Sequence, residues 1–232
     1  MFRWGVVVLL LSVPAFTQQL ASALGTTYSL NDAQLTGTAS VITGSESEST
    51  SITLIARRDG KSRIDLGTRG EIRSNSASAP QAFFRTDSQW YESPAHNAWT
   101  EANWFFPALS TLVAPQERSA TVVSSTSGTL RTFLNVTNQK PAQIELIKKL
   151  SATEYILDQS GLPVVIRYNI HPDDDFGTNI PVEVRLSDYR DVNGVKVPFR
   201  IQRLLSGSLE LDITISSVTI NPGTSDSAFA VR

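Results

Sequence analysis

Apolar and polar residues alternate through the last third of the chain, and this pattern predicts three antiparallel strands from residue 180 onward. Asn193-Gly194 separates the first two alternating runs. Asn-Gly favours a tight hairpin turn, because both central residues of such a turn need positive φ. This turn places Asp191 opposite Lys196, an opposite-charge pair that supports the hairpin.

The second turn of this group decides which residues face each other across the last two strands. A two-residue loop would pair the apolar Ile201 with the charged Asp212, whereas a three-residue loop, residues 206–208, pairs it with Ile213. Register follows the buried face, so we expect the three-residue loop, with Gly207 in the left-handed conformation.

That register gives these strands one apolar face and one polar face, as in antiparallel sheets that have one face exposed to solvent. The apolar face carries Val195, Val197, Phe199, Ile201, Leu209, Leu211, Ile213 and Ile215, and the polar face carries Lys196, Arg200, Gln202, Glu210 and Asp212. Arg203 is an exception, because it falls on the apolar face opposite Leu211.

Two further charged residues, Asp188 and Arg190, fall on the same face as Phe199. Either they pair at the mouth of a cavity, or a bulge near residues 187–189 turns them outward and Tyr189 inward. We favour the bulge, because buried charges are rare unless they are paired.

Similar alternation and turn signals upstream predict roughly eleven strands in all. Asp59-Gly60 and Asp87-Ser88 mark two of the turns. Every connection can be short, so we expect an antiparallel meander without crossovers. A twisted sheet of that many strands should curl into an open half-barrel. The predicted class is therefore mainly β.

Two segments have helical rather than strand spacing. The first carries Trp104, Phe105, Leu109, Leu112 and Val113, with Thr100 as its N-cap and Pro107 bending it or delaying its start. The second, "KPAQIELIKKLS", has proline near its start and lysines at its end. Both have apolar faces, and we expect them to cap or plug the concave side of the sheet.

The N-terminus predicts export. Arg3 precedes an apolar run from Gly5 to Phe16, and Ala21-Ser22-Ala23 is a small-residue cleavage pattern. These features are typical of a secretory signal peptide, residues 1–23, which leaves one domain at residues 24–232 in the periplasm or outside the cell. An uncleaved anchor is the alternative, although the run is shorter than the ~20 apolar residues that span a bilayer.

Composition and motifs argue against several functions. The chain has 20 basic and 22 acidic residues, which disfavours a nucleic-acid partner. It has no cysteine, and no serine-hydrolase or zinc-protease motif occurs. Its two histidines, and the carboxylates Glu92 and Glu101, form no recognisable catalytic set. The acidic loop "HPDDDFG" lacks the ligand spacing of a calcium loop and predicts a solvated turn. We expect no enzyme activity, cofactor or metal.

The second half of the chain resembles periplasmic proteins related to the outer-membrane lipoprotein carrier (LolA/LolB-like) family. The resemblance rests on Asp158, Gly161-Leu162-Pro163, Asn193-Gly194-Val195, Pro198, Asp226 and Phe229, and covers about residues 150–230. It implies an open β-barrel whose apolar concave face, lidded by helices, holds acyl chains. In that family a buried arginine holds the lid, and no motif places that residue here.

Together these observations predict a binding or carrier protein for a lipid acyl chain or lipidated cargo. The expected ligand-binding residues are Trp104, Phe105, Leu109, Phe199, Ile201, Ile213 and Ile215. The alternative is an envelope structural module with a filled core, no ligand and a protein partner. The sequence identifies neither the cargo nor the roles of Asp188, Arg190 and Arg203.

Overall fold

A computed structural model describes residues 20–26, 29–75, 80–110, 118–124, 128–134 and 139–231. Within these ranges the chain forms one 13-stranded sheet in which every recorded strand pair is antiparallel. The strands are β1 (Asp32–Thr43), β2 (Glu46–Arg57), β3 (Lys61–Leu66), β4 (Arg69–Ser74), β5 (Gln81–Thr86), β6 (Gln89–Glu92), β7 (Arg118–Ser124), β8 (Thr129–Leu134), β9 (Thr153–Leu157), β10 (Pro163–Ile170), β11 (Ile180–Val192), β12 (Val195–Leu205) and β13 (Ser208–Ile220). The helices are α2 (Ala95–Ala98) and α3 (Pro141–Leu150), with 3-10 turns η1 (Pro107–Leu109) and η2 (Asp226–Phe229).

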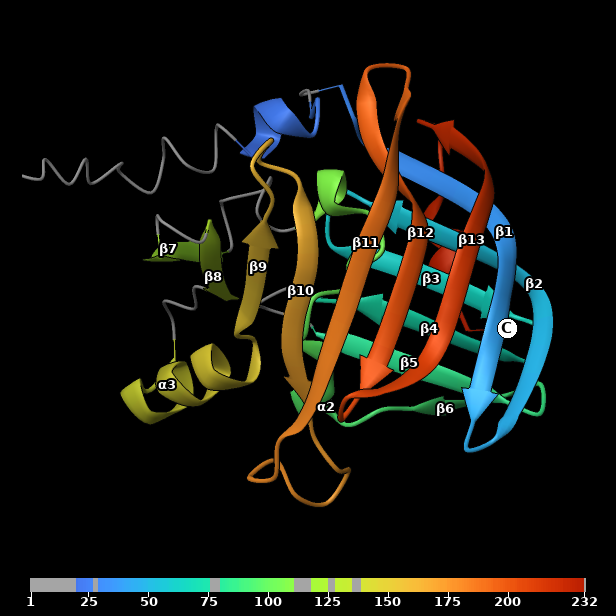
Figure 1. Cartoon of the computed structure of the whole chain (residues 1–232). Helices are drawn as coiled ribbons and strands as arrows, with labels where there is room; N and C mark the ends of the chain where they lie inside the picture. Colours follow the sequence, from blue (N-terminus) through green and yellow to red (C-terminus); the bar gives the residue numbers. More distant parts are fainter. Residues whose placement is uncertain are drawn as a thin grey trace, which may run out of the picture.

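The sheet is open and curved, which confirms the predicted mainly β half-barrel. Its strand order is β6-β5-β4-β3-β2-β1-β13-β12-β11-β10-β9-β8-β7. The prediction of one simple meander is wrong, because β1 pairs with β13 and joins two meanders at the middle of the sheet. The edges are therefore β6 and β7. Figure 1 shows β3, β4 and β5 crossing behind β11, β12 and β13.

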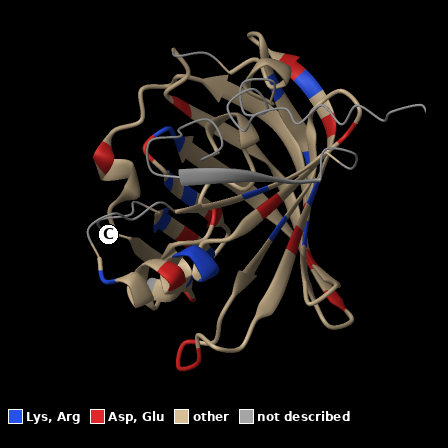
Figure 2. Ribbon diagram, turned by 90° about the vertical axis from the view of Figure 1, so that its left-hand side faces the viewer, with Lys and Arg blue, Asp and Glu red and all other residues tan. Residues whose placement is uncertain are grey.

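Apolar side chains gather between these two parts of the curved sheet. One continuous cluster includes Leu35 and Leu54 from the first meander and Val184, Ile201 and Ile213 from the second. Each of these five residues is at most 2% exposed. Figure 2 shows the sheet from the side, with acidic and basic residues spread along its strands rather than gathered in one patch. The strands thus bury one face and leave the other polar.

The structure confirms the predicted registers of the last three strands. Asp191 lies opposite Lys196, and Ile201 lies opposite Ile213. The prediction of a three-residue loop between β12 and β13 is wrong, and the second register arises from a shorter turn and a bulge. Leu205 pairs with Ser208 across a two-residue turn, and a bulge follows between Arg203 and Leu204.

In that bulge Glu210 is the extra residue, because Arg203 pairs with Leu211 and Leu204 pairs with Leu209. Leu209 therefore lies opposite Leu204 instead of continuing the apolar row of Leu211. Gly207 has a φ of 83°, as predicted. One inserted residue restores the register that keeps the apolar face buried.

The predicted bulge near residues 187–189 is wrong, because the β11–β12 register is the same on both sides of Asp188. Asp188 instead has a φ of 52°, and its carboxylate binds Arg190 at 2.7 Å. Both side chains remain solvent exposed, while the Arg190 guanidinium lies 4.3 Å from the centre of the Phe199 ring. Tyr189 is partly buried against the apolar cluster and donates its hydroxyl to the carbonyl of Pro163 at 2.7 Å.

The two predicted helices have different outcomes. α3 confirms the second, with proline at its first turn and Lys148 and Lys149 in its last. Its buried Ile147 and Leu150 lie outside the main apolar cluster, and α3 contacts β8 and α2. The prediction of the first helix is wrong. Thr100 follows α2 instead of starting a helix as its N-cap, and the chain beyond it forms turns and η1. Pro107 begins that 3-10 turn; the predicted Leu112 and Val113 lie outside the described residues.

The segment before β1 is part of the packing. Residues 20–23 form a helical turn, and Leu20 and Leu24 are 1% and 0% exposed within the main cluster. The carbonyl of Leu24 accepts a hydrogen bond from the Lys196 backbone at 2.9 Å. Gly25 has a φ of 69°, and a Cβ there would lie 1.8 Å from the carbonyl oxygen of Gly194. Cleavage after Ala23 stays a prediction, and it would remove Leu20 from the core. No helix among the described residues is long and apolar enough to cross a membrane.

We predict that a chain beginning at residue 20 is more stable than one beginning at residue 24, by about 2–3 kcal/mol, because the shorter chain lacks the buried Leu20 side chain. Urea unfolding of both chains, produced without a leader, measures the difference. Equal stabilities would show that Leu20 does not contribute to the folded domain. The N-terminal mass of the protein isolated from cells then tells which of the two chains is the mature form.

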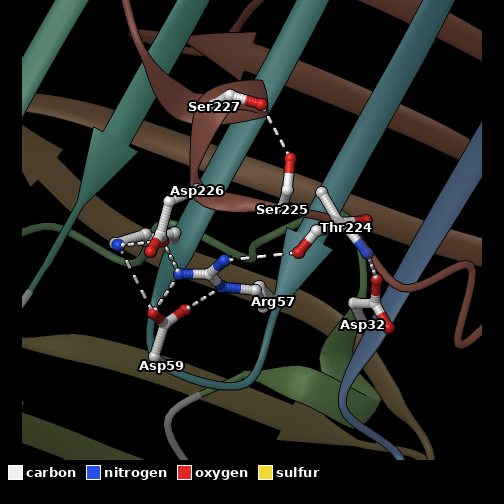
Figure 3. Close-up of polar contacts among 8 residues, drawn as sticks. Asp32, Arg57, Asp59, Thr224, Ser225, Asp226 and Ser227 are labelled. Atoms are coloured by element: carbon white, nitrogen blue, oxygen red, sulfur yellow. Dashed lines mark hydrogen bonds and ion pairs between the residues drawn. The ribbon is translucent and has the colours of Figure 1, made fainter.

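The C-terminal segment packs on the outer face of β2 and β3 (Figure 3). Asp226 accepts hydrogen bonds from Arg57 at 2.5 Å and from Lys61 at 2.8 Å, and the Arg57 guanidinium lies 5.0 Å from the Phe229 ring centre. Arg63 donates to the carbonyl of Ala228 at 2.9 Å. These contacts give a structural role to Asp226 and Phe229, the last two residues of the family-like pattern.

The bonds from Lys61 and Arg57 lower the pKa of Asp226 from 3.8 to about 2. Because the folded pKa is the lower one, the stabilisation is complete above pH 3.8 and is lost as the pH falls through 2. We predict that Asp226→Asn lowers the melting temperature at pH 7 and that the difference from the parent chain disappears near pH 2. A difference that is the same at both pH values would contradict this account.

Candidate functional site

The described part of the connection between β6 and β7, the two opposite edges of the sheet, ends at Ser110. It begins with α2 and continues through η1. All ten residues from Glu101 to Ser110 are buried. We call residues 98–110 the plug segment. Trp104, Phe105 and Phe106 at its centre are each at most 1% exposed, so the plug segment fills part of the concave side of the sheet.

The structure brings together all the residues expected to bind a ligand. The plug segment supplies Trp104, Phe105 and Leu109, β12 supplies Phe199 and Ile201, and β13 supplies Ile213 and Ile215. They belong to a single apolar cluster, and the most exposed of them is Phe199 at 8%. In this closed arrangement the aromatic plug segment and the apolar rows of the sheet are each other's packing partners.

Buried polar residues fix the centre of the plug segment. The Asn103 side chain donates to the carbonyl of Arg57 on β2 at 3.0 Å and to that of Leu109 at 2.9 Å. Glu101, which is 0% exposed, accepts from the Asn103 backbone at 3.0 Å and from the Tyr155 hydroxyl on β9 at 2.8 Å. The plug segment is thereby attached to both meanders by directional bonds as well as by apolar packing.

A second set of polar contacts holds the start of the plug segment. Arg73 on β4 is 8% exposed and donates to the carbonyl of Asn97 at 2.9 Å and to the hydroxyl of Thr100. Asn97 exchanges two hydrogen bonds with the backbone of His171, at 2.8 and 2.9 Å. Glu71 binds Arg73 at 2.7 Å. Arg73 therefore ties β4 to the start of the plug segment through these bonds.

Charged residues also interrupt the apolar concave face near Trp104. Arg203 lies opposite Val184 and Leu211, with its guanidinium 5.7 Å from the Trp104 ring centre. Burial lowers the pKa of Arg203, but the nearby Tyr168 and Glu210, followed by Glu71, outweigh burial and raise it. Arg203 is therefore a cation on an otherwise apolar surface.

The acidic and phenolic groups of this cluster respond to the same charges. Burial raises the pKa of Glu71, but the positive charges of Arg73 and Arg203 outweigh burial and the pKa is lowered. Burial raises the pKa of Tyr168, so its hydroxyl stays protonated. The cluster holds two arginines, Arg73 and Arg203, and two carboxylates, Glu71 and Glu210.

At the β6 edge the apolar side chains are exposed. Phe84 and Tyr91 lie opposite each other with ring centres 5.4 Å apart, and they are 40% and 44% exposed. Phe84 also lies opposite Glu71, and Glu71 lies opposite Ile64, which belongs to the buried cluster. The aromatic pair therefore lies on the same face of the sheet as Ile64, separated from it by the charged Glu71.

Sequence reasoning missed the polar residues that fix the plug segment. Glu101 and Asn103 stand inside the apolar stretch "AWTEANWFFPAL", and buried polar residues in such a stretch need partners. The presence of these two polar residues in an apolar stretch could therefore have indicated that they bind buried partners. Arg73 carries no such signal, because its strand alternates like its neighbours and its partners lie far away in the chain.

The remaining candidates have structural roles in the described residues. His171 is 4% exposed and its Nδ1 lies 2.8 Å from the Thr178 carbonyl, within the loop that follows β10. Asp175 accepts bonds from the Gly177 backbone and the Thr178 hydroxyl, as in a solvated turn. Within the described ranges no group of three potential metal ligands lies together. Asn135, part of a glycosylation triplet, lies outside the described residues.

We predict that Asn103→Ala destabilises the fold by about 1–3 kcal/mol, because it removes the side-chain donor of the Leu109 carbonyl and one of the two donors of the Arg57 carbonyl, which keeps the bond from the Gly60 backbone. Asn179→Ala, at an exposed loop position, is the matched control and should change stability by less than about 0.5 kcal/mol. Urea unfolding of both variants measures the difference. Equal effects would mean that the Asn103 bonds do not hold the plug segment.

No protein-family model matches the sequence, and no curated protein matches it. Solved structures do match. A domain from Vibrio parahaemolyticus described as an outer membrane lipoprotein-sorting protein is 11% identical, with a TM-score of 0.60 over 94% of this chain and 97% of that one. A DUF1329 family protein from Desulfovibrio piger is 13% identical, with a TM-score of 0.56 over 94% and 97%. A LolA superfamily protein from Nitrosomonas europaea is 11% identical, with a TM-score of 0.51 over 95% and 98%. Over nearly its whole length, the chain therefore has the fold of the LolA superfamily.

Proposed function

We propose that this protein is an exported, non-enzymatic carrier that binds an acyl chain of a lipid or of lipidated cargo on its concave face. The observation that carries the proposal is the aromatic plug segment, buried against apolar rows of β12 and β13. An acyl chain would take the place of the plug segment. The fold shared with lipoprotein-sorting and LolA superfamily structures supports this function.

The exchange would be reversible if burying the acyl chain and exposing the plug segment changed the free energy by similar amounts. A 12-carbon chain gains about 9 kcal/mol on leaving water, at ~0.8 kcal/mol for each buried CH₂ group. Exposing Trp104, Phe105, Phe106 and Leu109 would cost about 6–12 kcal/mol, at ~1.5–3 kcal/mol each. The two terms are similar in size, so neither the closed nor the loaded form would be locked. A carrier that must release its cargo requires such a balance.

The bonds of the plug segment would set its opening. Arg73, Asn103 and Glu101 hold it at few points, and its short helical elements have no continuous ladder to the sheet. Phe84 and Tyr91 offer exposed apolar surface where a chain could first make contact. Entry at this edge would bring the ligand along the concave row toward the plug segment.

The second candidate is an envelope module with a filled core, no ligand and a protein partner. It is favoured by the same burial, because the plug segment already occupies the concave side. The two candidates differ in whether the plug segment leaves. An interaction module would keep it in place, whereas the carrier requires that it move.

We predict that the protein purified from cell envelopes without detergent retains lipid, detected by native mass spectrometry, and that Ile213→Asp abolishes this retention. A carboxylate at this fully buried position would meet the acyl chain without a partner. Thr219→Asp, at an exposed position of the same strand, is the control and should retain lipid.

Circular dichroism of each variant establishes that it is folded. If Ile213→Asp does not fold, the milder Ile213→Thr should still reduce the lipid retained. A folded Ile213→Asp protein that keeps its lipid would show that the ligand does not lie on this face. A parent protein without lipid, which also fails to take up added dodecanol, would support the filled-core module.

A further inference from the structure

The Arg203 side chain lies on the apolar face of β12 and is only 16% exposed. Its neighbours across the sheet, Val184 and Leu211, offer no hydrogen-bond acceptor from their side chains. A guanidinium has five N–H donors and remains charged in proteins. An arginine with so little solvent exposure therefore needs hydrogen-bond acceptors from the protein around it.

Those acceptors are few. Glu210 is 3.8 Å from Arg203 at its nearest oxygen, a distance longer than a hydrogen bond. Tyr168 on β10, one strand beyond β11, provides a hydroxyl near the Arg203 side chain. The Nε atom of Arg203 is buried without a hydrogen-bond partner, and so is the Oε2 atom of Glu210, which has only the longer ionic contact with Arg203. Neither group is fully satisfied in the closed form.

The other arginine of the cluster differs. Arg73 binds Glu71 through two nitrogens and also binds Asn97 and Thr100, so its donors are used in holding the plug segment. Glu71 is likewise engaged by Arg73. Of the two cations, Arg203 is the one with a buried donor, its Nε atom, that has no hydrogen-bond partner.

The plug segment covers Arg203. Trp104 presents its ring to the guanidinium at 5.7 Å, a cation–π contact. When Trp104 moves away, Arg203 loses this contact and faces the surface on which an acyl chain would lie. An anion arriving with that chain would provide the acceptors that Arg203 lacks, and a bidentate carboxylate or phosphate matches the guanidinium fork.

We propose that Arg203 anchors the anionic headgroup, a carboxylate or a phosphate, of a single-chain lipid bound on the concave face. The inference rests on the proposed function, because it requires an acyl chain in place of the plug segment. It adds the chemical class of the ligand: a fatty acid or a single-chain lipid phosphate rather than an uncharged lipid.

The test compares ligands that share a 12-carbon chain and differ in the headgroup. Dodecanoate, dodecyl phosphate and dodecanol are titrated below their micelle concentrations, with binding followed by calorimetry. The parent protein should bind both anions about tenfold to a hundredfold more tightly than dodecanol, the range expected for hydrogen bonds to a charged group. Acetate and inorganic phosphate should not compete, because neither replaces the plug segment.

Arg203→Gln should bind dodecanol as the parent protein does and lose the preference for the two anions. Arg200→Gln, on the outer face of the same strand, is the control and should keep the preference. If Arg203→Gln does not fold, Arg203→Lys should keep the charge but weaken the preference, because an ammonium lacks the bidentate fork.

The outcomes separate the two proposals. Equal binding of all three chains by the parent protein, or an unchanged preference in Arg203→Gln, overturns the headgroup site and leaves the carrier function standing. Failure to bind any of the three chains overturns both. Competition by acetate or inorganic phosphate at equal concentration would identify a small-anion site instead of a lipid headgroup site.

Discussion

The pairing of the first strand with the last is the constraint on which the rest of the structure depends. Because β1 lies beside β13, the two meanders join at the middle of the sheet and leave β6 and β7 as its edges. The described part of the connection between these edges, up to Ser110, is buried on the concave side. The plug segment lies in this part: a connection that in most sheets would run over the surface is here buried along ten consecutive residues.

A buried connection brings a cost that the neighbouring residues offset. Backbone carbonyls and polar side chains taken out of water need partners, and Asn103, Glu101 and Arg73 supply or receive them. The aromatic residues between these points contribute apolar burial. The plug segment is therefore held by directional bonds as well as by the packing of its apolar centre.

Both ends of the described chain reinforce this arrangement from different sides. Leu20 and Leu24 enter the core, and the hydroxyl of Thr26 donates to the carbonyl of Ala108 in the plug segment at 3.2 Å. On the outer face, Asp226 and Phe229 bind β2 and β3 through Arg57 and Lys61. The interior contact joins the N-terminal segment to the plug segment, whereas the outer contact joins the C-terminal segment to the first meander.

The sequence by itself determined the features that depend on neighbours in the chain. Alternation and turn residues gave the β class, the turn after Val192, the pairing of Ile201 with Ile213 and the helix ending at Leu150. It also identified the apolar residues of the plug segment and of β12 and β13. Tertiary structure alone decided the rest: the pairing of β1 with β13, the irregular form of the segment after Thr100, the position of Arg73, and the contact of Arg203 with Trp104. These features arise from contacts between residues far apart in the chain, whose energies local periodicity does not record.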